Sequence, residues 1–186
     1  MKTIDEIIET IFTYYEKHGK NDYIGEEVTQ IEHMVQGAMF AENDGCSKEI
    51  VISVFLHDIG HLLVDENNEL MSNYGVKNHE KLGRIMLEKL GIPEPIPKLV
   101  ENHVKAKRYL VFKNENYNLS DASKKTLDFQ GGKMTKEEVC EFEKDDLFEM
   151  SLLVRKYDER SKVKGMKIND LDYYRSYIRN FLKQTK

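Results

Sequence analysis

Six side chains of types that bind metal ions are spread along the chain and give the sequence its clearest candidate for chemistry. One four-coordinate ion needs fewer ligands than this, whereas two ions that share a bridging carboxylate would use the whole set and leave positions open for a substrate. Asp58 is the candidate bridge, because each of its two oxygens can bind one ion. The six candidate ligands are His33, His57, Asp58, His79, His103 and Asp158.

The adjacent pair His57–Asp58 lies in the middle of the apolar segment 51–63, which we expect to be buried. A buried carboxylate is unfavourable unless it is paired with a cation, and this segment contains no lysine or arginine. The segment is predicted to be helical, which would place His57 and His61 on one face at i and i+4. The compensating positive charge must come from a metal ion or from another part of the chain.

Three polar side chains each lie about one helical turn from a candidate ligand: His61, Lys107 and Arg155. Two of them are cations, so a pocket beside the metal ions would have a positively charged wall. Such a wall favours a phosphate or phosphonate group. Taken singly, a lysine or arginine is more often a solvated surface residue, and a lone histidine is more often a hydrogen-bonded core residue.

The elements that must position these residues are predicted to be helices. Apolar residues recur with helical spacing, and no segment shows the alternation of a strand. Ser47, Asn78, Ser120 and Thr135 are predicted to cap helices, and Gly91 is predicted to follow the end of the helix 78–90. The fold is therefore predicted to be all-α and to form one domain over 1–186. Besides the segment 51–63, the predicted helices cover about 4–17, 27–42, 78–90, 96–104, 120–130, 135 onward, 145–157 and 171–182.

The chain of 186 residues has a formal net charge of -5, with 28 basic and 33 acidic residues. This balance argues against broad binding to nucleic acid or to an anionic membrane, whereas local cations can still bind a small anion. The N-terminal segment is typical of an amphipathic helix rather than a signal peptide, and the apolar runs are too short for a membrane span. Cys46 and Cys140 are predicted to be free thiols, which indicates the cytoplasm.

The candidate ligands themselves resemble the pattern of a known family. Four of them are similar to the signature of the HD superfamily, whose members are mostly metal-dependent phosphohydrolases with an all-helical fold. The two others match the additional pair found in the dinuclear members. The four are His33, His57, Asp58 and Asp158, and the additional pair is His79 and His103.

Further motifs resemble a narrower group in that superfamily, the mixed-valent diiron oxygenases that cleave the carbon–phosphorus bond of 2-amino-1-hydroxyethylphosphonate. The similarity covers most of the chain, from about 23 to 162, and leaves the helices 4–17 and 171–182 as flanking elements of a single HD domain. The matching motifs are DYIGE at 22–26, QIEH at 30–33, LHDIGH at 56–61, HVKAKRYL at 103–110, LSDAS at 119–123 and QGG at 130–132.

The resemblance implies two iron ions in a mixed-valent Fe(II)/Fe(III) pair, with dioxygen as co-substrate. The implied reaction converts the hydroxyphosphonate, a small-molecule substrate, into glycine and inorganic phosphate. By position, one iron would be bound by His33, His57, Asp58 and Asp158, and the other by Asp58, His79 and His103.

The resemblance also implies which residues contact the substrate. Tyr23 matches a tyrosine that occupies an iron site until the substrate displaces it, and Glu26 matches a glutamate that binds the substrate amine. Together with His61, these two are the expected catalytic residues. The expected contacts of the phosphonate group are His61, Lys107, Ser123 and Arg155.

Two alternative functions use the same residues. An HD phosphohydrolase acting on a nucleotide or phosphoester could use the metal pair to activate water, because ligand types alone do not separate iron from zinc or manganese. A catalytically silent HD module would bind a phosphorylated ligand, but the ligand set here is complete. The sequence leaves open the oligomeric state and whether the substrate amine is free or methylated.

Overall fold

The computed structural model describes residues 2–23, 25–63, 69–72, 75–114 and 116–185. Over these ranges the chain forms helices and two isolated β-bridges but no strand, which confirms the all-α prediction. The elements in order are α1 (Ile4–His18), α2 (Gln30–Asn43), α3 (Lys48–Leu56), the 3-10 helix η1 (Ile59–Leu62), α4 (His79–Leu90), α5 (Ile96–Lys113), α6 (Asp121–Phe129), α7 (Lys136–Phe142), α8 (Phe148–Arg160) and α9 (Leu171–Thr185).

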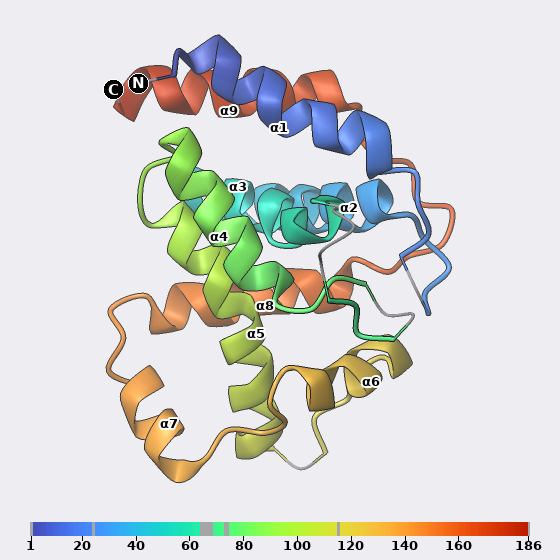
Figure 1. Ribbon diagram of the computed structural model, residues 1–186, viewed down its shortest axis with the longest axis vertical. Helices are drawn as coiled ribbons and strands as arrows, with labels where there is room; N and C mark the ends of the chain where they lie inside the picture. Colours follow the sequence, from blue (N-terminus) through green and yellow to red (C-terminus); the bar gives the residue numbers. More distant parts are fainter. Residues whose placement is uncertain (1, 24, 64–68, 73–74, 115, 186) are drawn as a thin grey trace.

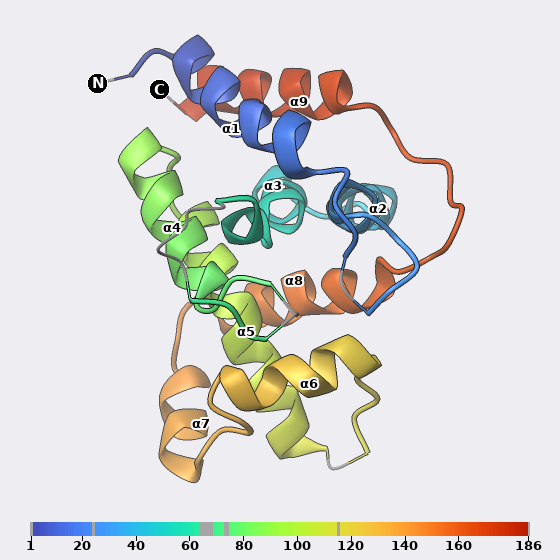
Figure 2. The same cartoon turned by 45° about the vertical axis from the view of Figure 1, so that its right-hand side comes forward.

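The helices lie in layers along the long axis of the molecule (Figure 1). α1 and α9 lie side by side at one end, where both termini are found, and α2 and α3 form the layer beneath them. The next layer contains α4, α5 and α8, and α5 contacts α3, α4 and α8. α6 and α7 lie at the opposite end, where α6 crosses the second half of α5 (Figure 2).

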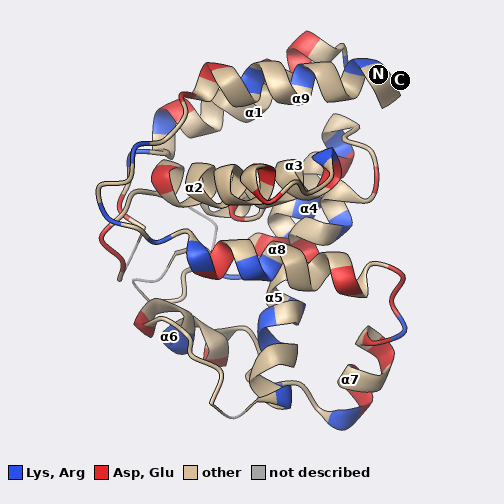
Figure 3. Ribbon diagram, turned by 180° about the vertical axis from the view of Figure 1, so that it is seen from behind, with Lys and Arg blue, Asp and Glu red and all other residues tan. Residues whose placement is uncertain are grey.

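α3 lies in the interior and carries charge only in its first turn, whereas most charged residues lie on the outer helices (Figure 3). Its Phe55 ring stacks on Tyr15 of α1, with ring centroids 4.7 Å apart, and on Tyr174 of α9 at 4.6 Å. The Tyr15 hydroxyl also donates a hydrogen bond to the backbone carbonyl of Phe55. The first and last helices therefore fix the helix that leads directly into His57.

Side-chain caps set where several helices begin. The predicted caps Ser47, Ser120 and Thr135 are confirmed, because each side chain accepts a hydrogen bond from the backbone N–H three residues later. α2 begins three residues after its predicted start, because Thr29 and Glu32 form a capping box that the prediction overlooks.

The predicted helix over 51–63 is wrong in its second half, because α3 ends one residue before His57. Asp58 has φ −101° and ψ 12°, and a 3-10 helix follows it. The turn brings Gly60 against α4, where a Cβ on Gly60 would lie 1.9 Å from the backbone carbonyl oxygen of His79. The break allows His57 and Asp58 to face the same point, whereas neighbouring residues of an α-helix point about 100° apart.

Two further helix starts differ in detail from the prediction. Asn78 precedes α4 as expected, but its backbone is left-handed with φ 58° and its side chain does not cap the helix. α8 begins at Phe148, three residues after the predicted start, because the Asp145 side chain accepts a hydrogen bond from Leu147 N in a turn before the helix. Gly91 ends α4 with φ 78°, as predicted.

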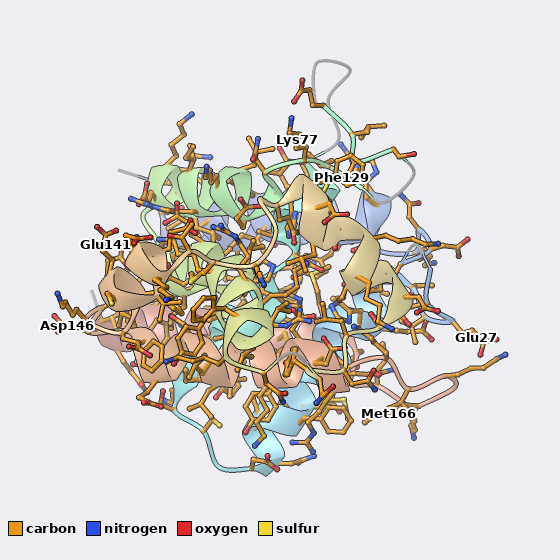
Figure 4. The ribbon with its side chains drawn as sticks, turned by 90° about the horizontal axis from the view of Figure 1, so that it is seen from below. Glu27, Lys77, Phe129, Glu141, Asp146 and Met166 are labelled. Atoms are coloured by element: carbon orange, nitrogen blue, oxygen red, sulfur yellow. The ribbon has the colours of Figure 1, made fainter. Side chains whose placement is uncertain are left out.

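Cys46 and Cys140 are both free thiols, as predicted. Viewed from the end that carries α6 and α7, the exposed side chains of Glu27, Glu141 and Asp146 lie at the periphery (Figure 4). Over the described ranges, none of the helices combines the length and the apolar character needed to cross a bilayer.

The contact between η1 and α4 gives a test of the fold. We expect Gly60→Ala to lower the free energy of unfolding by about 2–3 kcal/mol, because the added methyl group collides with backbone that cannot move aside. Gly45→Ala is the control: Gly45 has φ +74°, but no atom lies within 4 Å of the place its methyl group would take, so only a backbone penalty of about 1 kcal/mol is expected. Equal effects in urea denaturation would contradict the proposed contact.

Candidate metal centre

The Asp58 carboxylate lies among four imidazole rings. Its Oδ2 atom is 3.5 Å from His33 Nε2 and 3.4 Å from His57 Nε2. Its Oδ1 atom is 3.3 Å from His79 Nε2 and 3.5 Å from His103 Nε2. The two oxygens therefore face two different pairs of imidazoles, as the oxygens of a bridging carboxylate would.

Asp158 joins the first of these pairs. Its Oδ1 atom is 3.4 Å from His33 Nε2 and 3.6 Å from His57 Nε2. The structure thus brings together all six candidate ligands from α2, the turn after α3, α4, α5 and α8. They form two groups that share Asp58, one with His33, His57 and Asp158 and the other with His79 and His103.

The spacing within each group fits a metal ion. The Nε2 atoms of His33 and His57 are 3.0 Å apart, and those of His79 and His103 are 3.2 Å apart. Ligand atoms bound about 2.1 Å from one ion, at angles of about 90–110°, lie about 3.0–3.4 Å from one another. The donor sets, imidazole nitrogens with carboxylate oxygens, suit divalent and trivalent first-row metals, including iron.

The opposite nitrogen of three rings is held by backbone carbonyl groups. His57 and His103 each donate from Nδ1 to the carbonyl oxygen three residues earlier, at 2.7 and 2.6 Å. His33 donates from Nδ1 to the carbonyl oxygen of Ser161 at 2.8 Å. A proton held on Nδ1 leaves Nε2 with a lone pair directed into the site, which is the form of histidine that binds a metal ion.

The six candidate ligands are at most 4% exposed, so their charges act in a medium of low dielectric constant. Burial opposes ionisation of Asp58, but the charge of His57 and hydrogen bonds from the imidazoles hold the pKa of Asp58 well below its usual range. Burial also lowers the pKa of His57, yet Asp58 and Asp158 outweigh it and raise this pKa to about 10. Burial lowers the pKa of His103 to about 3. In the absence of a metal ion the first group therefore holds an extra proton on His57, which an ion bound there would replace, whereas His103 stays neutral.

Arg155 pairs with Asp158 and not with Asp58. This side chain is 2% exposed and donates hydrogen bonds to Asp158 and Glu159. Among the ion pairs of the described residues, Asp58 contacts only histidines. The charge of Asp58 is therefore available to bridge metal ions.

A cavity opens beside the two groups and reaches most of the predicted substrate contacts. The Tyr23 ring stacks on His33 with ring centroids 4.0 Å apart, and His61 stacks on His79 at 3.9 Å. Four candidate ligands, Asp58, His79, His103 and Asp158, line this cavity together with Tyr23, His61, Lys107, Ser123 and Arg155.

The cations of the cavity lie beside α6. Lys107 Nζ donates to Thr126 Oγ1 at 3.0 Å, and Arg155 Nη2 donates to Ser123 Oγ at 3.4 Å. Burial and the nearby Arg155 guanidinium lower the pKa of Lys107 to about 7. Ser123 lies in the first turn of α6, where the helix dipole adds a partial positive charge. This part of the cavity therefore suits an anionic group with several acceptor oxygens.

Glu26, expected to bind the substrate amine, is not among the described residues that line the cavity. Its Oε1 atom is 3.8 Å from Lys162 Nζ. Lys162 also donates to Ser120 Oγ at 2.8 Å and to Glu159 Oε1 at 3.2 Å. Lys162, a cation that none of the sequence motifs contains, therefore connects Glu26 with the start of α6 and with α8.

Three cavity residues with polar side chains were not predicted from the sequence: Gln30, Thr126 and Gln130. Thr126 follows Ser123 by three positions on α6, so helical spacing is a signal that identifies it. The two glutamines stand inside the QIEH and QGG motifs without an assigned role. Within the described part of the chain, Oε1 of each glutamine is buried and has no hydrogen-bond partner.

Comparisons with known proteins match most or all of the chain. The HD-domain family model matches residues 30–173. A hydroxymethylphosphonate dioxygenase from Gimesia maris is 36% identical over 99% of this chain and 92% of its own length. A 1-hydroxy-2-(trimethylamino)ethylphosphonate dioxygenase (glycine-betaine-forming) from Leisingera caerulea is 38% identical over 95% and 90%. An uncharacterized protein of Acanthamoeba polyphaga mimivirus is 45% identical over 100% of this chain and 86% of its own length.

The two groups of candidate ligands predict the metal content. Protein loaded with iron should contain about two ions per chain, because Asp58 can serve both groups. His103→Ala should reduce this to about one, while circular dichroism shows unchanged helix content. A wild-type chain that holds only one ion at full loading in elemental analysis would exclude the dinuclear site.

Proposed function

The chain belongs to the HD-domain family, and we propose that it is a dioxygenase that cleaves the carbon–phosphorus bond of a 1-hydroxyphosphonate. The relatives named as phosphonate dioxygenases align with nearly the whole chain and support this proposal. The substrate that we propose is 2-amino-1-hydroxyethylphosphonate, and the products are glycine and inorganic phosphate. One molecule of this substrate and one of dioxygen contain all the atoms of glycine and phosphoric acid, so the reaction needs no external reductant.

One observation carries the proposal: the bridging position of Asp58 lies beside a cavity that contains two buried cations. Asp58 faces both pairs of imidazoles, and Lys107 and Arg155 line the same cavity at 4% and 2% exposure. Two iron ions held by these groups, one Fe(II) and one Fe(III), would supply the redox chemistry with dioxygen. The cations place an anionic substrate beside that centre.

Binding of the phosphonate group is assigned to four side chains. Arg155 and Lys107 offer charged N–H donors, and Ser123 offers a hydroxyl in the first turn of α6. His61 accepts a hydrogen bond at Nδ1 from Val76 N, at 3.0 Å, so its Nε2 carries the proton and can donate to a phosphonate oxygen. Several donors on one group fix its orientation and thereby hold the hydroxylated carbon beside the metal pair.

Tyr23 and Glu26 are assigned to the other end of the substrate. Burial raises the pKa of Tyr23 well above its usual range, so its phenol stays protonated in the absence of a metal bond. Its position over His33 allows the phenol to cover the metal pair until the substrate displaces it. Glu26 would receive the substrate ammonium, with Lys162 as the cation that balances it in the free protein.

Oxygen dependence tests the proposed reaction. With the iron-loaded protein and 2-amino-1-hydroxyethylphosphonate, oxygen uptake and phosphate release should rise together in a ratio of about one to one, as the atom balance requires. The trimethylammonium and hydroxymethyl analogues, assayed in parallel, define the substrate range. Phosphate release under strict anaerobiosis would indicate a hydrolase, which is the alternative that uses the same ligands.

The pKa of Lys107 predicts a pH dependence of substrate binding. Its charged form, which binds the phosphonate, is present below about pH 7 and is lost above it, because burial places the pKa at about 7. The KM should therefore rise about tenfold between about pH 6 and about pH 8 relative to Lys107→Arg, whose guanidinium stays charged. The phosphonate group titrates equally in both assays, so the ratio of the two KM values does not contain its contribution. An unchanged ratio of the two KM values would show that Lys107 does not titrate in this range.

A further inference from the structure

His79 differs from the other three histidines of the metal centre in the environment of its second ring nitrogen. His33, His57 and His103 donate from Nδ1 to carbonyl oxygens at 2.6–2.8 Å. Within the described residues, His79 Nδ1 is buried and has no hydrogen-bond partner. Because an ion bound to Nε2 leaves the proton on Nδ1, this N–H needs an acceptor once the metal is bound.

The position of His79 in its helix explains the difference. His57 and His103 follow a helical turn, so the carbonyl oxygen three residues earlier lies within reach of Nδ1. His79 is the first residue of α4, and the residue before it, Asn78, is left-handed with φ 58°. No preceding helical turn therefore offers a carbonyl to His79.

The side chain of the next residue, Glu80, is a candidate acceptor. Its Oε2 atom lies 3.7 Å from His79 Nδ1, and Glu80 is only 7% exposed. Among the described residues, this oxygen too is buried without a hydrogen-bond partner. An unpaired donor and an unpaired acceptor thus lie side by side, roughly 0.5 Å beyond the hydrogen-bond range.

We propose that Glu80 is a positioning residue for the metal ion of the Asp58, His79 and His103 group, and accepts a hydrogen bond from His79 Nδ1. The carboxylate fixes the ring with Nε2 toward Asp58 and makes it a stronger electron donor than the carbonyl-bound histidines. This positioning matters most for an ion that would have only three protein ligands, whereas Asp158 would give the other ion a fourth.

A structural role for Glu80 has a different consequence. A carboxylate in the first turn of α4 also interacts favourably with the helix dipole, and its loss would lower the stability of the metal-free protein. The positioning role instead weakens the binding of one ion of the two. Metal affinity and the thermal midpoint of the metal-free protein therefore separate the two roles.

The test is an anaerobic titration with Fe(II) against a competing chelator. Glu80→Met keeps the length of the side chain but offers no oxygen. It should lower the Fe(II) affinity of the site that His103→Ala abolishes by about 10- to 100-fold. The other ion should bind as in the wild type. Glu80→Gln keeps an acceptor without the charge and should lose less. Glu88→Met, at an exposed position of the same helix, is the control and should change neither ion.

A double mutant makes the test specific. In the His103→Ala background, which retains only the ion of the His33 and His57 group, Glu80→Met should have no further effect on Fe(II) affinity. Equal weakening of both ions, an effect that persists in this background, or wild-type affinity in Glu80→Met would each overturn the proposal. The titration uses no phosphonate, so its result is independent of the proposed reaction.

Discussion

The structure depends on a buried carboxylate, Asp58, that contacts four imidazoles and no lysine or arginine among its described ion pairs. A buried charge of this kind is unfavourable without a cation. The local structure serves this contact: α3 ends before His57, and the following turn directs His57 and Asp58 to the same point. That turn needs Gly60, because α4 approaches it too closely for any side chain.

The other helices contribute to the site in different ways. α1 and α9 do not carry candidate ligands, but their aromatic rings hold Phe55 and thus the end of α3. α5 contributes to both the candidate metal centre and the cavity beside it, since His103 and Lys107 lie one turn apart on it. α6 adds Ser123 and Thr126, which accept hydrogen bonds from Arg155 and Lys107, respectively. The helical layers therefore place a cavity that contains two buried cations beside the candidate metal centre.

Local patterns predicted much of this arrangement. The apolar segment around His57 and Asp58 indicated a buried site, and the caps at Ser47, Ser120 and Thr135 set helix starts correctly, because both signals lie within a few residues. The turn after α3 could not be predicted in this way, since it depends on a contact between residues far apart in the sequence. The same holds for Lys162, which reaches Glu26 from the far end of the chain.

The measurement that tests the central claim most directly is anomalous diffraction at the iron edge from crystals of iron-loaded protein. The account predicts two peaks per chain about 3.5–4 Å apart, one on each side of the Asp58 carboxylate. A single peak, or a second peak that lies away from His79 and His103, would contradict it.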